Sequence, residues 1–237
     1  MLPEISVDQM IEIDRLMVEE FHIPLLSMMD AAGAALARLA LDLHHPKRVT
    51  ILAGKGNNGG GGMAAARHLD AGDVKVTVVT SSPLAEMKDA PRHQLRLLEG
   101  HGVSVLQDID QDTDLFIDAL LGYSARGAPR GKAAELIRKA NHSGKPVLCL
   151  DYPSGLDPLT GLWHEPSFKE NDVMTLALPK MHLLGNPDIA RLFLGDIGVP
   201  LKLYEQMGLV VDNPFSSLDS ATSPEGALAG RFVRLDG

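Results

Sequence analysis

The chain has 237 residues, of which 22 are Lys or Arg and 31 are Asp or Glu, so its net charge is −9 at neutral pH. Nucleic-acid-binding proteins usually present a basic face, so this balance argues against a nucleic-acid partner and favours a small molecule. Apolar residues make up 45% of the chain, which is enough for the core of one large domain. No apolar run approaches the roughly 18 residues of a membrane-spanning helix, so we expect no membrane partner.

The cysteine content and the N-terminal residues indicate the cellular compartment in which the protein is expected. The single cysteine, Cys149, lies in an apolar run, which excludes a disulfide framework. The first residues lack the basic and apolar regions of a signal peptide. We therefore expect a reducing compartment, the cytoplasm.

Two helices are expected at the start of the chain. Ser6 and Gln9 have the spacing of a capping box, and the apolar residues after them indicate a helix that ends before Pro24. A second helix is predicted from about Ser27 to Pro46.

Short apolar runs then alternate with helical segments. Strands are predicted at residues 49–53, 74–80, 103–106, 115–120, 147–150, 173–178 and 192–194, and helices near 61–70, 84–100 and 131–142. Nearly continuous Val, Ile and Leu runs are typical of strands that are buried on both faces. The pattern predicts a three-layer α/β sandwich with a mostly parallel central sheet in residues 1–212. Residues 213–237 are rich in small and polar residues, and we predict a weakly ordered tail.

Glycine is unusually dense directly after the first predicted strand. Residues 54–62 read GKGNNGGGG, with six glycines in nine positions. A strand, a glycine loop and a helix can bind a phosphate through backbone N–H groups, although a plain tight turn is the alternative. The next strand ends in Ser81 and Ser82, without the acid that holds a ribose in NAD dehydrogenases, and no Gly-Lys-Ser/Thr of a P-loop follows.

Polar clusters also follow two other predicted strands. Asp118 follows the apolar residues 115–117 and precedes a glycine-bearing segment at 122–128, and Asp151 begins the segment DYPSGLD after the strand at 147–150. Each carboxylate alone is as often a helix cap or an Asx turn as a ligand. Because parallel strands bind ligands beyond their carboxyl ends, the three clusters together predict a site.

Four segments in this order resemble the NAD(P)H-hydrate epimerase family, which comprises the YjeF N-terminal domain and apolipoprotein A-I-binding protein. They are GKGNNGGGG at 54–62, DALLG at 118–122, DYPSGLD at 151–157 and GDIGVP at 195–200, and MDAAG at 29–33 is similar to a fifth. The resemblance covers roughly residues 5–205. It implies a Rossmann-like fold and an enzyme that interconverts the R and S forms of hydrated NADH and NADPH, followed by a separate or fused dehydratase.

The resemblance also implies a set of site residues. Those expected to bind the substrate are Asn57, Asn58, Gly59, Gly60, Gly61, Gly122, Tyr123, Ser124, Ala125, Arg126, Gly127, Ala128 and Asp151. A potassium ion is implied at Asn58, Asp118 and Ser154. Inversion at C6 of the nicotinamide ring needs a proton donor and acceptor, and we assign that general acid/base role to Asp151. Arg126 and Arg130 are candidates to pair with phosphates, and Lys180 is a candidate to reach the site; the alternative for all three is a solvated surface position.

One departure from the family pattern leaves a second function open. The family has Asp where this chain has Gly61, so the loop lacks a carboxylate that bears on catalysis or ligand orientation. The alternative is a non-catalytic relative that binds a nucleotide-like ligand, which Gly61 favours. Intact Asn57, Asn58, Asp118 and Asp151 favour the enzyme. A homodimer is an expectation from the family alone.

Overall fold

The computed structural model describes residues 2–109, 112–216 and 230–235 of the chain. Its helices are α1 (Val7–Glu19), α2 (Leu25–His44), α3 (Asn57–Ala71), the short 3-10 helix η1 (Leu84–Glu86), α4 (Asp89–His101), α5 (Gly131–Ser143) and α6 (Leu201–Gln206). Its strands are β1 (Arg48–Ala53), β2 (Lys75–Thr80), β3 (Ser104–Leu106), β4 (Leu115–Ala119), β5 (Val147–Leu150), β6 (Asn171–Leu176), β7 (Ile189–Gly195) and β8 (Phe232–Arg234). Within these described residues, no helix is both long and apolar enough to cross a bilayer.

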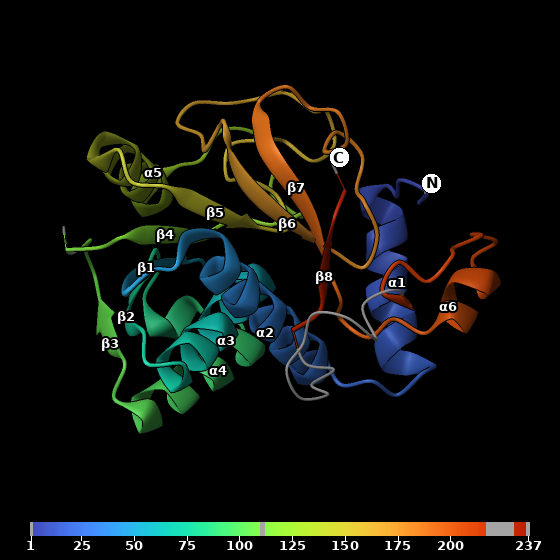
Figure 1. Ribbon diagram of the computed structural model, residues 1–237, viewed down its shortest axis with the longest axis horizontal. Helices are drawn as coiled ribbons and strands as arrows, with labels where there is room; N and C mark the ends of the chain where they lie inside the picture. The colour runs from blue at the N-terminus through green and yellow to red at the C-terminus, as the bar shows by residue number, and fades with distance from the viewer. Residues whose placement is uncertain (1, 110–111, 217–229, 236–237) are drawn as a thin grey trace.

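The strands form one sheet in the order β3-β2-β1-β4-β5-β6-β7-β8 (Figure 1). All neighbours are parallel except β8, which pairs antiparallel with β7. The sheet with helices on both faces confirms the predicted Rossmann-like α/β fold. The strand order reverses between β1 and β4, and such a switch point opens a crevice beyond the carboxyl ends of the strands.

Alternate residues of each strand contact different helix layers. Ile51 lies in the cluster formed with α2, α3 and α4, whereas its neighbour Leu52 lies in the cluster formed with α5. Figure 1 shows α2, α3 and α4 grouped together beside the sheet. A third cluster joins α1 and α6 to the segment after β6, so α1 is held at the edge of the crevice.

The N-terminal helices form as their sequence indicates. The Ser6 hydroxyl accepts the Gln9 N–H, and the Gln9 side chain accepts the Ser6 N–H, which completes the predicted capping box. Pro24 lies at the N-cap of α2. The helix therefore begins two residues before the predicted start at Ser27.

The glycine segment is not the open loop that we predicted. Helix α3 begins at Asn57, so Gly59, Gly60, Gly61 and Gly62 are helical. None of the glycines at 54–62, all of which are described, has a positive φ. Their small size instead allows close packing within the protein: a Cβ on Gly54 would lie 2.0 Å from the Leu120 carbonyl oxygen.

Part of the segment that we predicted to be a weakly ordered tail forms a strand. Phe232 to Arg234 form β8, whose pairing covers the edge of β7. The Phe193 and Phe232 rings pack edge to face with centroids 5.9 Å apart, and Arg231 pairs with Asp196. Residues 217–229 of the tail lie outside the described residues.

Candidate functional site

A cavity of about 530 Å³ lies beyond the carboxyl ends of the central strands. One wall is apolar and comes from α1 and α2, with Met10, Met28 and Met29. The opposite side is polar and comes from the start of α3, the segment after β4 and Asp151 after β5. The cavity therefore lies at the switch point of the sheet, where the sequence predicted a site.

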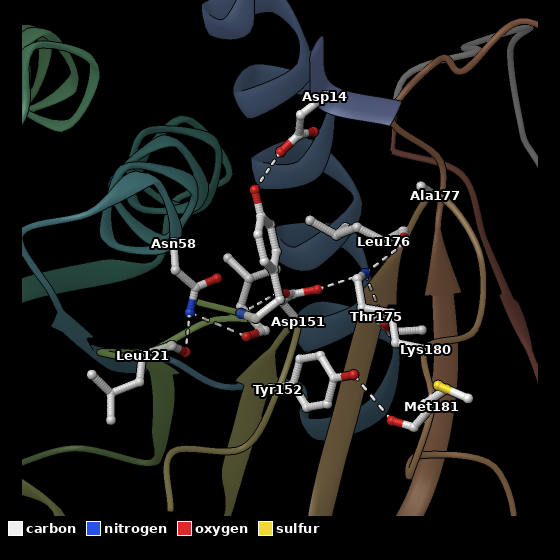
Figure 2. Close-up of polar contacts among 12 residues, drawn as sticks. Asp14, Asn58, Leu121, Asp151, Tyr152, Thr175, Leu176, Ala177, Lys180 and Met181 are labelled. Atoms are coloured by element: carbon white, nitrogen blue, oxygen red, sulfur yellow. Dashed lines mark hydrogen bonds and ion pairs between the residues drawn. The ribbon is translucent and has the colours of Figure 1, made fainter. Parts of the chain in front are cut away.

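A buried ion pair lies beside this cavity, with Asp151 in the lining and Lys180 behind it. Asp151 Oδ1 lies 2.7 Å from Lys180 Nζ, and its Oδ2 accepts the Tyr123 backbone N–H at 3.0 Å (Figure 2). Lys180 is 0% exposed and also donates to the Thr175 hydroxyl and the Leu176 carbonyl. Lys180 thus occupies a buried position beside Asp151, not the surface position that was its alternative.

The backbone at Asp151 helps to aim its carboxylate. Asp151 directly follows β5 and has a φ of 70°, in the left-handed region that few residues other than glycine adopt. Its N–H donates to the Met174 carbonyl of β6 at 2.7 Å. The strand end is therefore fixed by the sheet, and the side chain turns toward the cavity and Lys180.

Asp118 and Ser154 lie beneath the cavity rather than in its lining. Asp118 Oδ1 accepts the Ser154 hydroxyl at 2.8 Å and the Leu120 N–H at 3.1 Å, and Oδ2 accepts the Ser154 N–H at 2.7 Å. The Ser154 hydroxyl in turn accepts the Leu121 N–H. Asp118 is 0% exposed, and its burial raises the pKa to about 6 against these hydrogen bonds, which lower it.

Asn58 joins the helix to the two central strand ends. Its Nδ2 donates to the Leu121 carbonyl at 2.6 Å and to the Leu150 carbonyl at 3.2 Å (Figure 2). The side chain also lines the cavity, as does that of Asn57. The sequence pair Asn57-Asn58 therefore lies at the site because α3 begins there.

The other predicted substrate-binding residues divide into two groups. Those that line the cavity are Gly61, Gly122, Tyr123, Ser124 and Ala125; those outside its lining are Gly59, Gly60, Arg126, Gly127 and Ala128. A Cβ on Gly59 would lie 1.9 Å from the Gly54 carbonyl oxygen, and a Cβ on Gly60 would lie 2.6 Å from the Met29 sulfur. These two glycines therefore serve the packing of α3.

The segment after β4 is held by its own contacts. The exposed Arg126 guanidinium donates to the Tyr123 and Ala125 carbonyls. Asp157 Oδ2 accepts the Gly127 N–H at 2.8 Å. Arg130, by contrast, lines the cavity with Lys55, Lys88 and Lys132, of which Lys55 and Lys132 also pair with nearby glutamates.

Sequence reasoning missed Asp14. Its Oδ2 accepts the Tyr123 hydroxyl at 2.6 Å, and both residues line the cavity. Burial raises the pKa of Asp14, although the Tyr123 hydrogen bond and Lys180 oppose this shift. The sequence does contain a signal that could have identified this residue: it is an acidic residue on the apolar side of α1, between Met10 and Met17.

Comparison with known proteins gives one family match. The family described as "YjeF-related protein N-terminus" matches residues 25–182. The NAD(P)H-hydrate epimerase of Dehalogenimonas lykanthroporepellens is 40% identical over 86% of this chain and 86% of its own length. The NAD(P)H-hydrate epimerase of Rhodopirellula baltica is 33% identical over 88% of this chain and 89% of its own length.

Two further similarities concern a longer relative and a solved structure. The bifunctional NAD(P)H-hydrate repair enzyme Nnr of Moorella thermoacetica is 30% identical over 84% of this chain, which corresponds to 41% of that protein. The crystal structure of yeast ynu0 superposes with a TM-score of 0.79 over 99% of this chain and 100% of the yeast chain. At 22% identity, this second similarity shows a shared fold.

Proposed function

The chain belongs to the family of YjeF-related N-terminal domains, and we propose that it is an isomerase that interconverts the R and S epimers of hydrated NADH and NADPH. The observation that carries this proposal is the buried Asp151–Lys180 pair beside a cavity at the switch point. Relatives that align over most of this chain bear the name of that activity.

The cavity has suitable chemistry for a hydrated nicotinamide dinucleotide. The methionine-rich wall offers an apolar surface for the ring, next to Asp151. The first N–H groups of α3 are available to a diphosphate, because hydrogen bonding within the helix begins with the Gly60 N–H to the Gly56 carbonyl. Arg130, Lys55, Lys88 and Lys132 supply cationic groups for phosphates.

Asp151 is the proposed general acid/base. Inversion requires that a bond at C6 break and form again, and each route needs a group that gives and takes a proton. The Asp151 carboxylate is held by the Tyr123 N–H, and the buried Lys180 ammonium is in contact with it as a proton source. Because these partners fix the carboxylate, little reorganisation is needed when the substrate binds.

A chromatographic assay with purified R and S hydrates of NADPH tests this function. The wild-type chain should accelerate their interconversion beyond the spontaneous rate, and Asp151→Asn should lower the rate by at least about 100-fold. Asp8→Asn, on the exposed side of α1, is the control variant and should keep the wild-type rate. Wild-type turnover in a folded Asp151→Asn variant would remove Asp151 from catalysis.

We also propose a potassium ion at Asn58, Asp118 and Ser154. The buried Asp118 has no basic side chain as a partner among the described residues, and burial disfavours its charge. The Leu121 and Leu150 carbonyls converge on the Asn58 amide, so carboxylate, carbonyl, amide and hydroxyl oxygens lie in one region. A hard cation favours such ligands, and it would supply the positive charge that Asp118 lacks.

Ligand affinity in different chloride salts tests the ion. The affinity for NADP should be higher in potassium chloride than in lithium chloride at equal ionic strength, because the smaller ion does not fit the same ligands. The control is Asp118→Asn, in which the two salts should give equal affinities. Wild-type affinity that is independent of the cation argues against this site.

Gly61 is the specific observation that favours the second candidate, a ligand-binding module. The position lies near the start of α3 and lines the cavity, where the family has a carboxylate. A Cβ there would meet only the Leu150 Cδ2 methyl, at 2.9 Å, so a side chain needs a small shift of a flexible neighbour. The helical backbone also removes the strain that a positive φ would impose on Asp.

Gly61→Asp therefore separates the two candidates. A new hydrogen bond to a charged group is worth about 1.5–3 kcal/mol, so an enzyme should gain about 10- to 150-fold in rate or affinity. Gly62→Asp is the matched contrast, since its Cβ would lie 2.5 Å from the Ala119 Cβ and should disturb the fold. If wild type and a folded Gly61→Asp both bind NADP but neither turns over the hydrates, the binding module replaces the enzyme.

The remaining expectations belong to the same proposal. The chain spans 41% of the length of two of the bifunctional NAD(P)H-hydrate repair enzymes that it matches, and a separate dehydratase that consumes one epimer stays an expectation from the family. A homodimer stays an expectation from the family. A cytoplasmic location stays an expectation from the single cysteine, which is buried and free.

A further inference from the structure

A second carboxylate faces the cavity from a different wall. Asp151 follows β5, whereas Asp14 belongs to α1, and both line the same cavity. Tyr123 contacts both: its N–H donates to Asp151 Oδ2 and its hydroxyl donates to Asp14 Oδ2. About the length of a tyrosine side chain therefore separates the two carboxylates, which Figure 2 shows at different heights in the site.

The ionised Asp14 side chain lowers the stability of the fold at this position. It is half-buried on the apolar side of α1, and desolvation outweighs the Tyr123 hydrogen bond and the Lys180 charge, so its pKa is raised. A neutral Asn would accept the same hydroxyl without that cost. A carboxylate at such a position inside a candidate active site is expected to serve the chemistry.

Inversion at C6 needs groups on both faces of the ring. If one group removes the hydroxyl from one face and returns it to that face, the configuration is retained. We propose that Asp14 is a second catalytic residue, which acts on the ring face opposite to the Asp151–Lys180 pair. This inference rests on the proposed epimerase function and specifies how that site inverts its substrate.

The reaction balances without an oxidant or a reductant. The Asp151 carboxylate passes a proton from the Lys180 ammonium to the C6 hydroxyl; the C–O bond breaks and its electron pair leaves with water. The ring remains as a cation that is conjugated with N1. A second water adds to C6 from the opposite face, and Asp14 Oδ1 takes its proton. Asp14 Oδ1 accepts no hydrogen bond within the described residues, and Tyr123 is the positioning residue that holds Oδ2.

Water labelled with ¹⁸O separates this role from a structural one. Wild type should incorporate one labelled oxygen for each inversion. Asp14→Asn, which keeps an acceptor for Tyr123, should lose inversion by at least about 100-fold. It should still exchange oxygen with retention, because the Asp151 side can release and return water. Mass spectrometry measures the label and chromatography the epimers, each corrected for the spontaneous reaction.

The controls make each outcome informative. Asp8→Asn on the same helix should invert and exchange like wild type. Asp14→Ala is a second variant, in which added formate should replace the missing carboxylate and restore inversion. Either Asp14 variant is sufficient for the test if the other does not fold. Inversion by Asp14→Asn within a few-fold of wild type overturns the inference, as does a proportional loss of exchange and inversion. Inversion by wild type without label excludes loss of water and also overturns it. A wild type that does not invert overturns the proposed function itself.

Discussion

Three aspartates in the site show how their surroundings give one side chain different properties. Asp118 is fully buried with neutral donors, and its pKa rises to about 6. Asp151 is 4% exposed and pairs with Lys180. Asp14 is half-buried against a phenol. The roles that we propose follow these contacts: Asp118 as a ligand of a cation, and Asp151 and Asp14 in proton transfer.

Lys180→Met tests the buried ion pair at the residue scale. The change leaves Asp151 buried without its cation, so the free energy of unfolding should fall by about 3–5 kcal/mol. Urea denaturation measures the change, and Lys139→Met, whose lysine is 42% exposed, is the control. If the free energy of unfolding of Lys180→Met fell by less than about 1 kcal/mol, the ion pair with Asp151 would contribute little to stability.

Asp14→Asn should stabilise the protein near neutral pH. The pKa of Asp14 is raised in the folded state, so the folded protein holds the proton more tightly than the unfolded chain. Its ionised form therefore lowers stability above that pKa, and the penalty disappears as the pH falls toward about 4. Melting temperatures across this range should show a gain for Asp14→Asn at pH 7 that shrinks in acid. Equal curves for the two proteins would contradict the shift.

At the scale of elements, small residues set how closely α3 approaches its neighbours. Gly33 of α2 faces Ala64 of α3, and a Cβ on Gly33 would lie 2.6 Å from the Ala64 Cβ. Gly62 faces Ala119 of β4 in the same way. This close packing places the first turn of α3, and with it Asn58, at the ends of β4 and β5.

Gly33→Ala should therefore loosen the site as well as the fold. Overpacking of this kind costs about 1–3 kcal/mol, and the displaced α3 should also weaken NADP binding. Gly100→Ala is the matched control, because Gly100 is helical in α4 with open space around it. The control should gain about 0.4–1 kcal/mol. Similar denaturation curves for the two variants would contradict the role of the α2–α3 contact.

At the scale of the whole molecule, the C-terminal strand completes the sheet. β8 pairs with β7, and Phe232 packs on Phe193. A chain that ends at residue 212 would expose the long edge of β7, and unpaired edges promote association.

Deletion of residues 213–237 should lower the free energy of unfolding by at least about 2 kcal/mol and produce oligomers. Urea denaturation and analytical ultracentrifugation measure the two effects. The full-length variant Phe232→Ala should show part of the stability loss and remain unassociated. If the truncated chain kept the wild-type free energy of unfolding and stayed monodisperse, β8 would contribute little to stability or to protection of the β7 edge.

The sequence by itself determined the parallel sheet and the strand ends beside which the cavity lies. Runs of Val, Ile and Leu specify buried strands through local side-chain chemistry, and the residues that follow a strand must lie at its end. Asp118 and Asp151 were therefore predictable as neighbours. The capping box at Ser6 and Gln9 was predictable for the same reason, since its hydrogen bonds span three residues.

Only the tertiary structure decided what depends on distant contacts. Glycine has low intrinsic helix propensity, so the helical start at Asn57 arises from the packing of α3 against α2 and β4. Tyr123 and Asp14 are 109 residues apart, and no local pattern pairs them. The short strand β8 shows no pattern that indicates its partner. Packing between distant segments fixed these features, and it also brought Lys180 and Asp14 to the same cavity region as Asp151.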